Sequence, residues 1–407
     1  MRSRRRAGDR VARVALTCLA SAACVEEAAR SHATVTDSAG VTIVDLGVLD
    51  YAALPTWVLE DEPRLRIGVV EGDPARQWSR LDGAGRLSDG TVLGLDKSSR
   101  EVRAFTQSGA HLWTAGGNGE GPGEFRFPWA LTVLPGDSIL VSDPGTGRLT
   151  VLGPRGEFVR TASVLGVEGQ LLTWGLLASD EVLYEVRSSS READPLILEA
   201  YSRLGAVNTE GESNRGFGTF VLDTQYAEGN DPNTAFSPAL FDDLALFAPW
   251  DGAVWFSANE AYEIERYGPG QALERIVRWS GPDRTIRPED IERLKSVHLA
   301  GAAADAQARH YVEEFFRYQP VSPAFAPFSR MLVDPGGRIW LQDYLREDLP
   351  DADAQWLLLA PDGTDVVARA RHPRRFKPLA LGDEWILGVS TDELDVEYLD
   401  LYTLPPH

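Results

Sequence analysis

The stretch LSDGTVLGLD, from Leu87 to Asp96, recurs in the same form at two later places in the chain. The second copy is LPGDSILVSD at Leu134–Asp143, and the third is VDPGGRIWLQD at Val333–Asp343. Each copy begins with a turn of Gly, Asp or Pro, continues as an apolar strand and reaches an aspartate. A second strand and a further turn follow each copy, at VRAFTQSG (Val102–Gly109), LTVLGPRG (Leu149–Gly156) and LLLAPDG (Leu357–Gly363). The repeat therefore predicts a chain built from similar small β-sheets.

The interval from Asp96 to Asp143 is close to the length of a four-stranded propeller blade. Weaker copies fill the gaps, such as WGLLASDEVLY at Trp174–Tyr184 and APWDGAVWF at Ala248–Phe256. The sequence thus predicts an all-β fold, a six-bladed β-propeller over residues 35–407. The expected blades span about 79–125, 126–169, 170–235, 236–285, 323–372 and 373–404. We expect Val35–Arg66 to add a strand to the incomplete last blade and close the ring, although seven blades remain an alternative.

One segment, about residues 287–318, breaks the strand pattern and predicts a small helical insertion. Pro288 stands at a first-turn position with acidic residues beside it, which is typical of a helix start. In the second half, Tyr311, Val312, Phe315 and Phe316 form one apolar face. Two placements are open for this insertion: packing on the rim of the propeller, or a lid over its central funnel.

The first residues have the pattern of a targeting segment. Arginines crowd the start, and the short apolar run Val14–Cys24 follows them, too short to span a bilayer. The run ends Ser-Ala-Ala-Cys24, which resembles bacterial lipoprotein signals that end before an acylated cysteine. We therefore expect a signal peptide at 1–23, lipidation of Cys24 and a tether at 24–34. Ordinary cleavage after Ala22 or Ala23 is the alternative. The sequence predicts an exported protein of the outer membrane or periplasm that meets the membrane only through its lipid anchor.

Composition narrows the classes of function. Hydrophobic residues make up 43% and charged residues 25% of the 407 residues, as in soluble globular proteins. The formal net charge is −21, which argues against nucleic-acid binding because phosphate contacts need a basic face. Both cysteines, Cys18 and Cys24, lie in the targeting segment, so the expected propeller has no thiol, disulfide or cysteine metal site.

A family resemblance follows from two motifs. The run GGNGEGPGEFRFP at Gly116–Pro128, with the strand Ile139–Asp143 and Arg148 after it, resembles the repeat of NHL-type propellers. The order DSAGVTIV at 37–44 resembles the opening of secreted bacterial six-bladed propeller proteins of the lipoprotein type. The resemblance implies a fold and export. It implies no catalytic residues, because propellers host many unrelated functions.

Few sequence motifs in this chain indicate catalysis, phosphate binding or metal binding. The glycine-rich run 116–123 is followed by a strand and no Lys-Ser/Thr pair, so we interpret it as a linker between blades and not as a phosphate loop. No two of the six histidines have metal-site spacing, and no Gly-x-Ser-x-Gly elbow occurs. Asp96, Asp143 and Asp343 recur at one blade position, where we expect them to accept backbone N–H bonds in turns. We predict no catalytic residue, no metal ligand and no cofactor, with calcium as the one open alternative.

The remaining candidate is the central funnel, because the first strand of each propeller blade lines it. Residues expected near the starts of these strands, or in a turn nearby, are Arg80, Trp129, Trp174, Trp250, Arg330 and Lys377. Tryptophan and arginine suit binding, because they offer broad apolar faces and forked donors. The alternative is that Trp129 and Trp174 simply pack between blades. A basic and aromatic throat in an acidic protein favours a small anionic or sugar-like ligand.

The sequence as a whole predicts a non-enzymatic propeller that binds such a ligand, or an envelope protein, at the bacterial cell envelope. The competing hypothesis is a calcium-dependent hydrolase or lyase of the lactonase-like propeller type, with its metal in the central channel. Only analogy of fold supports the second hypothesis.

Overall fold

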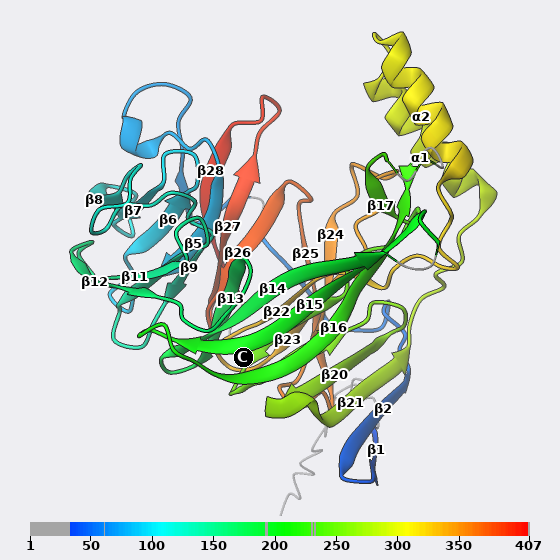
Figure 1. The fold of residues 1–407 in the computed structure, drawn as a ribbon, viewed down its shortest axis with the longest axis horizontal. Helices are drawn as coiled ribbons and strands as arrows, with labels where there is room; N and C mark the ends of the chain where they lie inside the picture. The colour runs from blue at the N-terminus through cyan, green and yellow to red at the C-terminus, as the bar shows by residue number, and fades with distance from the viewer. Residues whose placement is uncertain (1–32, 61, 192–193, 229–230, 232, 406–407) are drawn as a thin grey trace, which may run out of the picture. The chain divides into compact units, whose positions relative to one another are not determined.

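The computed structural model describes residues 33–405 except 61, 192–193, 229–230 and 232. The expected signal peptide, Cys24 and most of the expected tether lie outside these residues. Within them, six β-sheets follow one another along the chain (Figure 1). Two helices interrupt the order of strands between the fourth and fifth sheets.

In each of the first three sheets, the strands lie side by side in the order in which they follow one another along the chain. The first sheet contains β5 (Leu81–Arg86), β6 (Val92–Asp96), β7 (Glu101–Phe105) and β8 (His111–Gly116). The second contains β9 (Ala130–Val133), β10 (Ile139–Asp143), β11 (Arg148–Leu152) and β12 (Phe158–Ser163). The third contains β13 (Leu171–Ala178), β14 (Glu181–Arg191), β15 (Ile197–Asn208), β16 (Ser213–Ala227) and β17 (Phe236–Pro238).

The last three sheets recruit strands from the N-terminal part of the chain. The fourth has β18 (Leu246–Trp250), β19 (Ala253–Ser257), β20 (Glu263–Gly268) and β21 (Ala272–Ser280), then β2 (Val41–Val48) and β1 (Thr34–Ser38). The fifth has β22 (Phe328–Val333), β23 (Ile339–Asp343), β24 (Ala354–Leu359), β25 (Val366–His372) and then β3 (Thr56–Val58). The sixth has β26 (Phe376–Leu381), β27 (Trp385–Thr391), β28 (Glu397–Thr403) and then β4 (Leu65–Ile67). The expected closing strand is thus the short β4, while β1, β2 and β3 extend two other sheets.

The core lies between neighbouring sheets and joins them in a ring. Among the described residues, a buried apolar cluster lies between each sheet and the next one around the ring. Leu387 and Leu399 of the sixth sheet pack with Leu81 and Phe105 of the first, which joins the last sheet to the first. The second strands show the burial that this packing requires, because every residue of β6, β10 and β19 is buried. The prediction of an all-β propeller with a small helical insertion is confirmed.

The insertion contains α1 (Pro288–Gly301) and α2 (Ala306–Tyr318). The third sheet has unusually long strands, and β14, β15 and β16 run toward the helices (Figure 1). Tyr311 of α2 donates a hydrogen bond to Glu228, directly after β16. Phe315 and Phe316 pack near Leu240 and Phe325, in the segments beside the two helices. The insertion is therefore tied to the third sheet and to the segments before β18 and β22.

No helix among the described residues is long and apolar enough to cross a membrane.

Candidate functional site at the channel mouth

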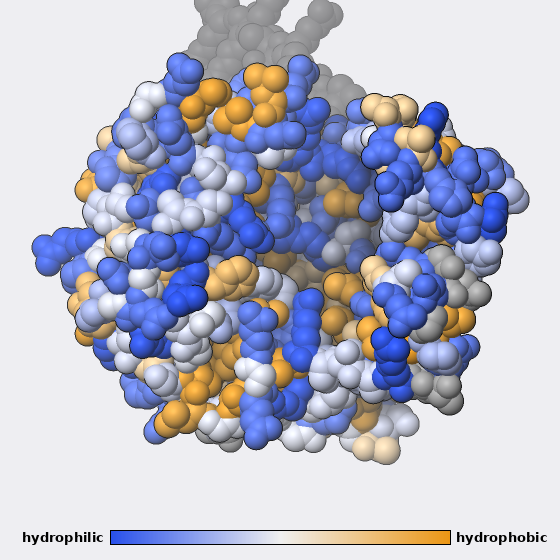
Figure 2. Space-filling view, turned by 45° about the horizontal axis from the view of Figure 1, so that its top comes forward, coloured by the Kyte–Doolittle hydropathy of each residue, from blue (hydrophilic) through white to orange (hydrophobic). Residues whose placement is uncertain are grey.

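The first strands of the sheets line the centre of the ring, and neighbouring first strands β5, β9, β13, β18 and β22 lie against one another. A space-filling view shows a hollow in the middle of the molecule with a largely hydrophilic rim (Figure 2). The first strands begin at one end of this central channel. We call the residues gathered there the channel mouth: Arg80, Asp82, Lys97, Trp129, Trp174, Arg330 and Lys377.

Asp82, the second residue of β5, binds two lysines at the mouth. Lys97 Nζ donates to Asp82 Oδ2 at 2.7 Å, and Lys377 Nζ donates to Asp82 Oδ1 at 3.0 Å. Burial alone would raise the pKa of Asp82, but the hydrogen bond from Lys97 and the charge of Lys377 hold it below the usual value. The carboxylate therefore stays ionised, with both of its oxygens engaged.

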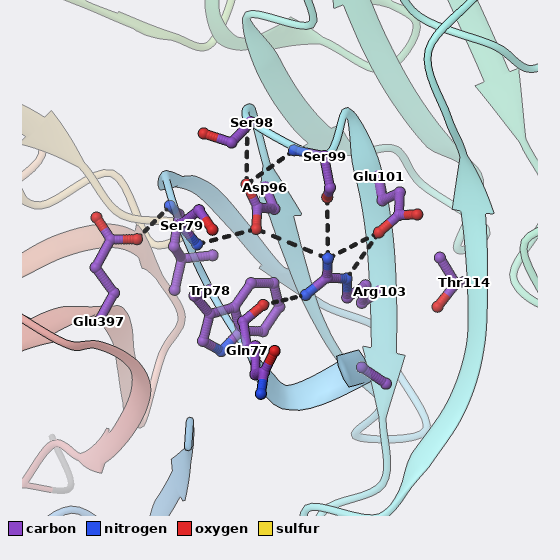
Figure 3. A network of polar contacts seen from close by, with 12 residues as sticks. Gln77, Trp78, Ser79, Asp96, Ser98, Ser99, Glu101, Arg103, Thr114 and Glu397 are labelled. Carbon is purple, nitrogen blue, oxygen red and sulfur yellow. Dashed lines mark hydrogen bonds and ion pairs between the residues drawn. The ribbon is translucent and has the colours of Figure 1, made fainter. Parts of the chain in front are cut away.

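The turn that carries Lys97 is rigid because Asp96 organises it. Asp96 Oδ1 accepts the backbone N–H groups of Ser98 and Ser99 at 2.9 and 3.3 Å, and Oδ2 accepts that of Ser79 at 3.1 Å (Figure 3). Arg103 lies beside this carboxylate and also reaches Ser99 Oγ at 2.9 Å. The Lys97 N–H donates to the carbonyl of Arg80 at 2.9 Å, which fixes both chain segments. Burial lowers the pKa of Lys97, and the charge of Arg80 contributes to the decrease.

A row of aromatic rings continues the mouth from Lys97 toward the fourth sheet. Lys97 Nζ lies 4.2 Å from the ring centre of Trp129, a cation–π distance. Trp129 meets Trp174 edge to face at 6.0 Å, and Trp174 meets Phe247 in the same way at 5.4 Å. Trp174 is 41% exposed, so it contributes an open aromatic surface although it packs against two rings.

The indole of Trp174 is oriented by a buried carboxylate. Its Nε1–H donates to Glu185 Oε2 at 2.9 Å. The fully buried Glu185 also accepts hydrogen bonds from Arg187 and Ser202 on its other oxygen. The ring is therefore held in one orientation.

Arg330, the third residue of β22, is the most unusual group at the mouth. Its Nη1 is buried without a hydrogen-bond partner, and no ion pair of its guanidinium occurs among the described residues. Burial lowers the pKa of Arg330 to about 10, and Asp82 is the carboxylate whose charge acts in the opposite direction. A guanidinium without a direct counter-ion is unfavourable in such a place.

Five of the six funnel residues predicted from the sequence lie at one end of the ring: Arg80, Trp129, Trp174 and Lys377 are linked by these contacts, and the charge of Asp82 acts on Arg330. Trp250 is the exception. It is the last residue of β18, at the opposite end of that strand, and packs against the core cluster of the fourth and fifth sheets. A Cβ on Gly337, which has a φ of 85°, would meet its ring at 2.2 Å. The sequence pattern placed Trp250 in a turn, but here it fills the space beside a hairpin of the neighbouring sheet.

Sequence reasoning missed Asp82, Lys97, Glu185 and Phe247. One signal was present: the chain has only three lysines, and two of them, Lys97 and Lys377, bind Asp82. The separation of Asp82 from Lys377 by 295 positions hides this contact from any local pattern.

The repeated aspartates behave differently from one sheet to another. Asp143 accepts three backbone N–H bonds, from Arg126, Phe127 and Gly145, at 2.7 to 3.0 Å. Like Asp96, it acts as the sequence predicted. Asp343 instead accepts a bond from Arg369 at 2.5 Å, and burial raises its pKa to about 6. The expectation of a turn cap is therefore wrong for Asp343.

Among the described residues, no group of three or more His, Cys, Asp or Glu side chains could hold a metal ion.

No model of a known protein family matches the sequence, and no curated protein matches it. Solved structures do match. A member of the DUF4221 family from Bacteroides vulgatus is 9% identical, with a TM-score of 0.50 over 85% of this chain and 97% of that one. An exported protein from Bacteroides fragilis, so described, is 11% identical, with a TM-score of 0.43 over 86% and 98%. Virginiamycin B lyase from Staphylococcus aureus is 11% identical, with a TM-score of 0.38 over 84% and 99%. The first of these likenesses shows a shared fold.

Proposed function

We propose that the protein binds a small anionic ligand at the channel mouth and catalyses no reaction there. The observation that carries this proposal is Arg330, whose buried Nη1 has no partner. An anionic group placed at the mouth supplies the counter-charge that the guanidinium lacks, and a charge-assisted bidentate contact suits its fork of donors.

The surroundings of Arg330 support an anion over a cation. Arg80, Lys97 and Lys377 add three positive charges, whereas Asp82 already binds two lysines. Glu397, also near, accepts the backbone N–H of Leu81 at 2.6 Å. Among the residues that form the channel mouth, four cations therefore face one carboxylate, Asp82, while the neighbouring Asp96, Glu185 and Glu397 are already engaged by hydrogen bonds. The exposed ring of Trp174 beside them provides a flat apolar surface of the kind that sugars and aromatic acids stack on.

We propose that this binding protein is located at the cell envelope. The support is the N-terminal pattern of arginines, a short apolar run and Cys24. Mass spectrometry of the protein expressed in a bacterium tests the anchor. An acylated N-terminal cysteine, lost in Cys24→Ser, is the expected result. An unmodified mature chain beginning at Ala23 or Cys24 would contradict the lipid anchor and leave the binding proposal untouched.

The binding test uses D-glucuronate as the anionic probe and D-glucose as its neutral match. Tryptophan is labelled with a nitrogen isotope, and the indole N–H signals of Trp129 and Trp174 are assigned by single replacements with Phe. Both signals are expected to shift saturably with glucuronate and not with glucose. Arg330→Met is expected to weaken binding at least about tenfold, the effect of losing one charge-assisted contact of about 1.4 kcal/mol or more.

The matched control is Arg155→Met, because Arg155 is an exposed arginine in a hairpin turn and forms no ion pair among the described residues. It should bind as the unmodified protein does. Equal binding by Arg330→Met and Arg155→Met would refute the proposal. The calcium-dependent alternative is tested on the same protein by thermal melts in EDTA and in calcium, where a clear rise in Tm with calcium would favour it.

A further inference from the structure

We propose a second ligand site at the opposite ends of the first strands β5 and β9, which takes a small sugar acid through Arg86 and Trp385. The site is independent of the channel mouth. Arg86 is the last residue of β5 and Asp82 is its second, so the two sites lie roughly 13 Å apart along one strand.

The site is a cavity of about 490 Å³. Its walls are three hairpin turns and one aromatic ring, contributed by the first, second and sixth sheets: residues 86–90, Gln107, residues 134–137 and Trp385. The volume suits a ligand of one or two sugar rings.

The turns that form the cavity are tied to one another. The backbone N–H of Ser88 donates to Asp137 Oδ1 at 2.8 Å, and its hydroxyl donates to Asp137 Oδ2 at 2.5 Å. Gln107 Nε2 donates to the carbonyl of Asp89 at 2.9 Å. The bonds of Ser88 join the first and second sheets, and the bond of Gln107 joins two turns of the first sheet. Together they hold the polar walls in place before any ligand arrives.

Arg86 is the charged group in these walls that lacks a polar partner among the described residues. Its Nε is buried without a partner, and its guanidinium has no ion pair among the described residues. Burial lowers the pKa of Arg86, and the charge of the nearby Arg64 contributes to the decrease. The guanidinium lies over the ring of Trp385, 5.7 Å from its centre, which is within cation–π distance. A carboxylate on the ligand would supply the missing counter-charge in a bidentate contact.

The rest of the cavity suits hydroxyl groups. Asp89 and Asp137 are carboxylates at its wall, and each keeps acceptor capacity beyond the bonds already made, because an ionised carboxylate accepts about four hydrogen bonds. Carboxylate acceptors repel a compact inorganic anion but accept hydrogen bonds from sugar hydroxyls, and the charges of Arg86 and the nearby Arg64 together balance those of the two aspartates. A ligand with one carboxylate and several hydroxyls satisfies Arg86 and both aspartates at once.

The experiment follows the indole N–H signal of Trp385, assigned with Trp385→Phe, while D-glucuronate is added to the full protein. We expect a saturable shift with a Kd of about 1 mM or tighter, and none with D-glucose. Arg86→Met should weaken this binding at least about tenfold, whereas Arg330→Met should leave it unchanged. Circular dichroism of each variant establishes that it is folded.

Each outcome separates the two sites. A Trp385 signal that does not move with glucuronate, or that moves equally in Arg86→Met, overturns the second site even if Trp174 responds. A response of Trp385 without any response of Trp129 or Trp174 supports the second site and contradicts ligand binding at the channel mouth. Loss of both responses in Arg330→Met alone would show that only the mouth binds and that Trp385 senses it indirectly.

Discussion

At the scale of single residues, Arg330 carries an energetic cost besides the binding role that we propose for it. A buried cation without a partner opposes folding, so a neutral side chain of similar length should stabilise the protein. We predict that Arg330→Met raises the free energy of unfolding by about 1–3 kcal/mol while it weakens glucuronate binding. Urea denaturation of both proteins measures the change. A destabilised variant would mean that Arg330 is needed by the fold and not by a ligand.

His372 is a second residue whose protonation the fold controls. Trp356 Nε1 donates to His372 Nε2 at 2.8 Å, and the carbonyl of Pro373 lies 2.8 Å from Nδ1. One ring nitrogen therefore accepts and the other donates, which describes a neutral imidazole. Burial lowers the pKa of His372 from 6.5 to about 4. The unfolded chain then takes up a proton between these values that the folded chain refuses, so stability falls as pH decreases.

We predict that this loss reaches about 3 kcal/mol between pH 6.5 and pH 4. The measurement is urea denaturation of the unmodified protein and of His372→Gln over this range. The advantage of the unmodified protein over the variant should shrink as the pH falls. The comparison is necessary because Asp243 and Asp343, with pKa values raised to about 6, change stability in the opposite direction in the same range. Parallel curves for the two proteins would contradict the neutral histidine.

At the scale of elements, an aspartate at the end of a second strand stabilises both the turn after it and the segment that leads into the first strand. Asp143 accepts three backbone N–H groups, and its removal leaves these donors unsatisfied. We predict that Asp143→Ala lowers the free energy of unfolding by about 2–3 kcal/mol. Asp353→Ala is the matched control, because Asp353 is exposed and forms one long ion pair of 3.6 Å. Thermal or urea denaturation compares the two, and equal effects would exclude the capping role.

The helical insertion depends on Asp290 at the start of α1. Its Oδ2 accepts the backbone N–H of Arg287 at 2.8 Å, and its Oδ1 accepts Arg346 at 2.6 Å from the segment after β23. We predict that Asp290→Ala speeds amide hydrogen exchange in α1 at least about tenfold, equivalent to 1.4 kcal/mol of local opening, without affecting β10 or β27. Glu292→Ala, at an exposed position of the same helix, is the control. Faster exchange throughout the sheets would show that the insertion is part of the global core.

At the scale of the whole molecule, the ring closes where β4 pairs with β28. Arg66 of β4 forms two hydrogen bonds, of 2.9 and 2.8 Å, with the fully buried carboxylate of Asp400. We predict that Arg66→Met lowers the free energy of unfolding by about 2–4 kcal/mol, because it leaves a buried charge without its partner. The double variant Arg66→Met/Asp400→Asn should recover part of this loss. Urea denaturation measures both, and an Arg66→Met protein as stable as Arg155→Met would show that the pair contributes nothing to closure.

The sequence by itself determined the repeated sheets and the two helices, because the patterns that produce them are local. Alternation along a strand, a Gly or Asp turn and a helix-starting Pro act over a few residues. The channel mouth was predicted only in part for the same reason: the starts of first strands could be located, but not the partners that each side chain meets. Only the tertiary structure shows that Asp82 binds Lys377.

The tertiary structure decided where the N-terminal strands pair and which end of a strand each tryptophan occupies. β2 and β3 join the fourth and fifth sheets in parallel, and only β4 completes the sixth. Backbone hydrogen bonds across a sheet edge are the same for every residue type except proline, so an edge strand carries little information about its neighbour. Trp250 and Trp174 occupy different ends of the channel although both are tryptophans in first strands. Only the packing against the neighbouring sheets decides that Trp174, and not Trp250, lies at the channel mouth.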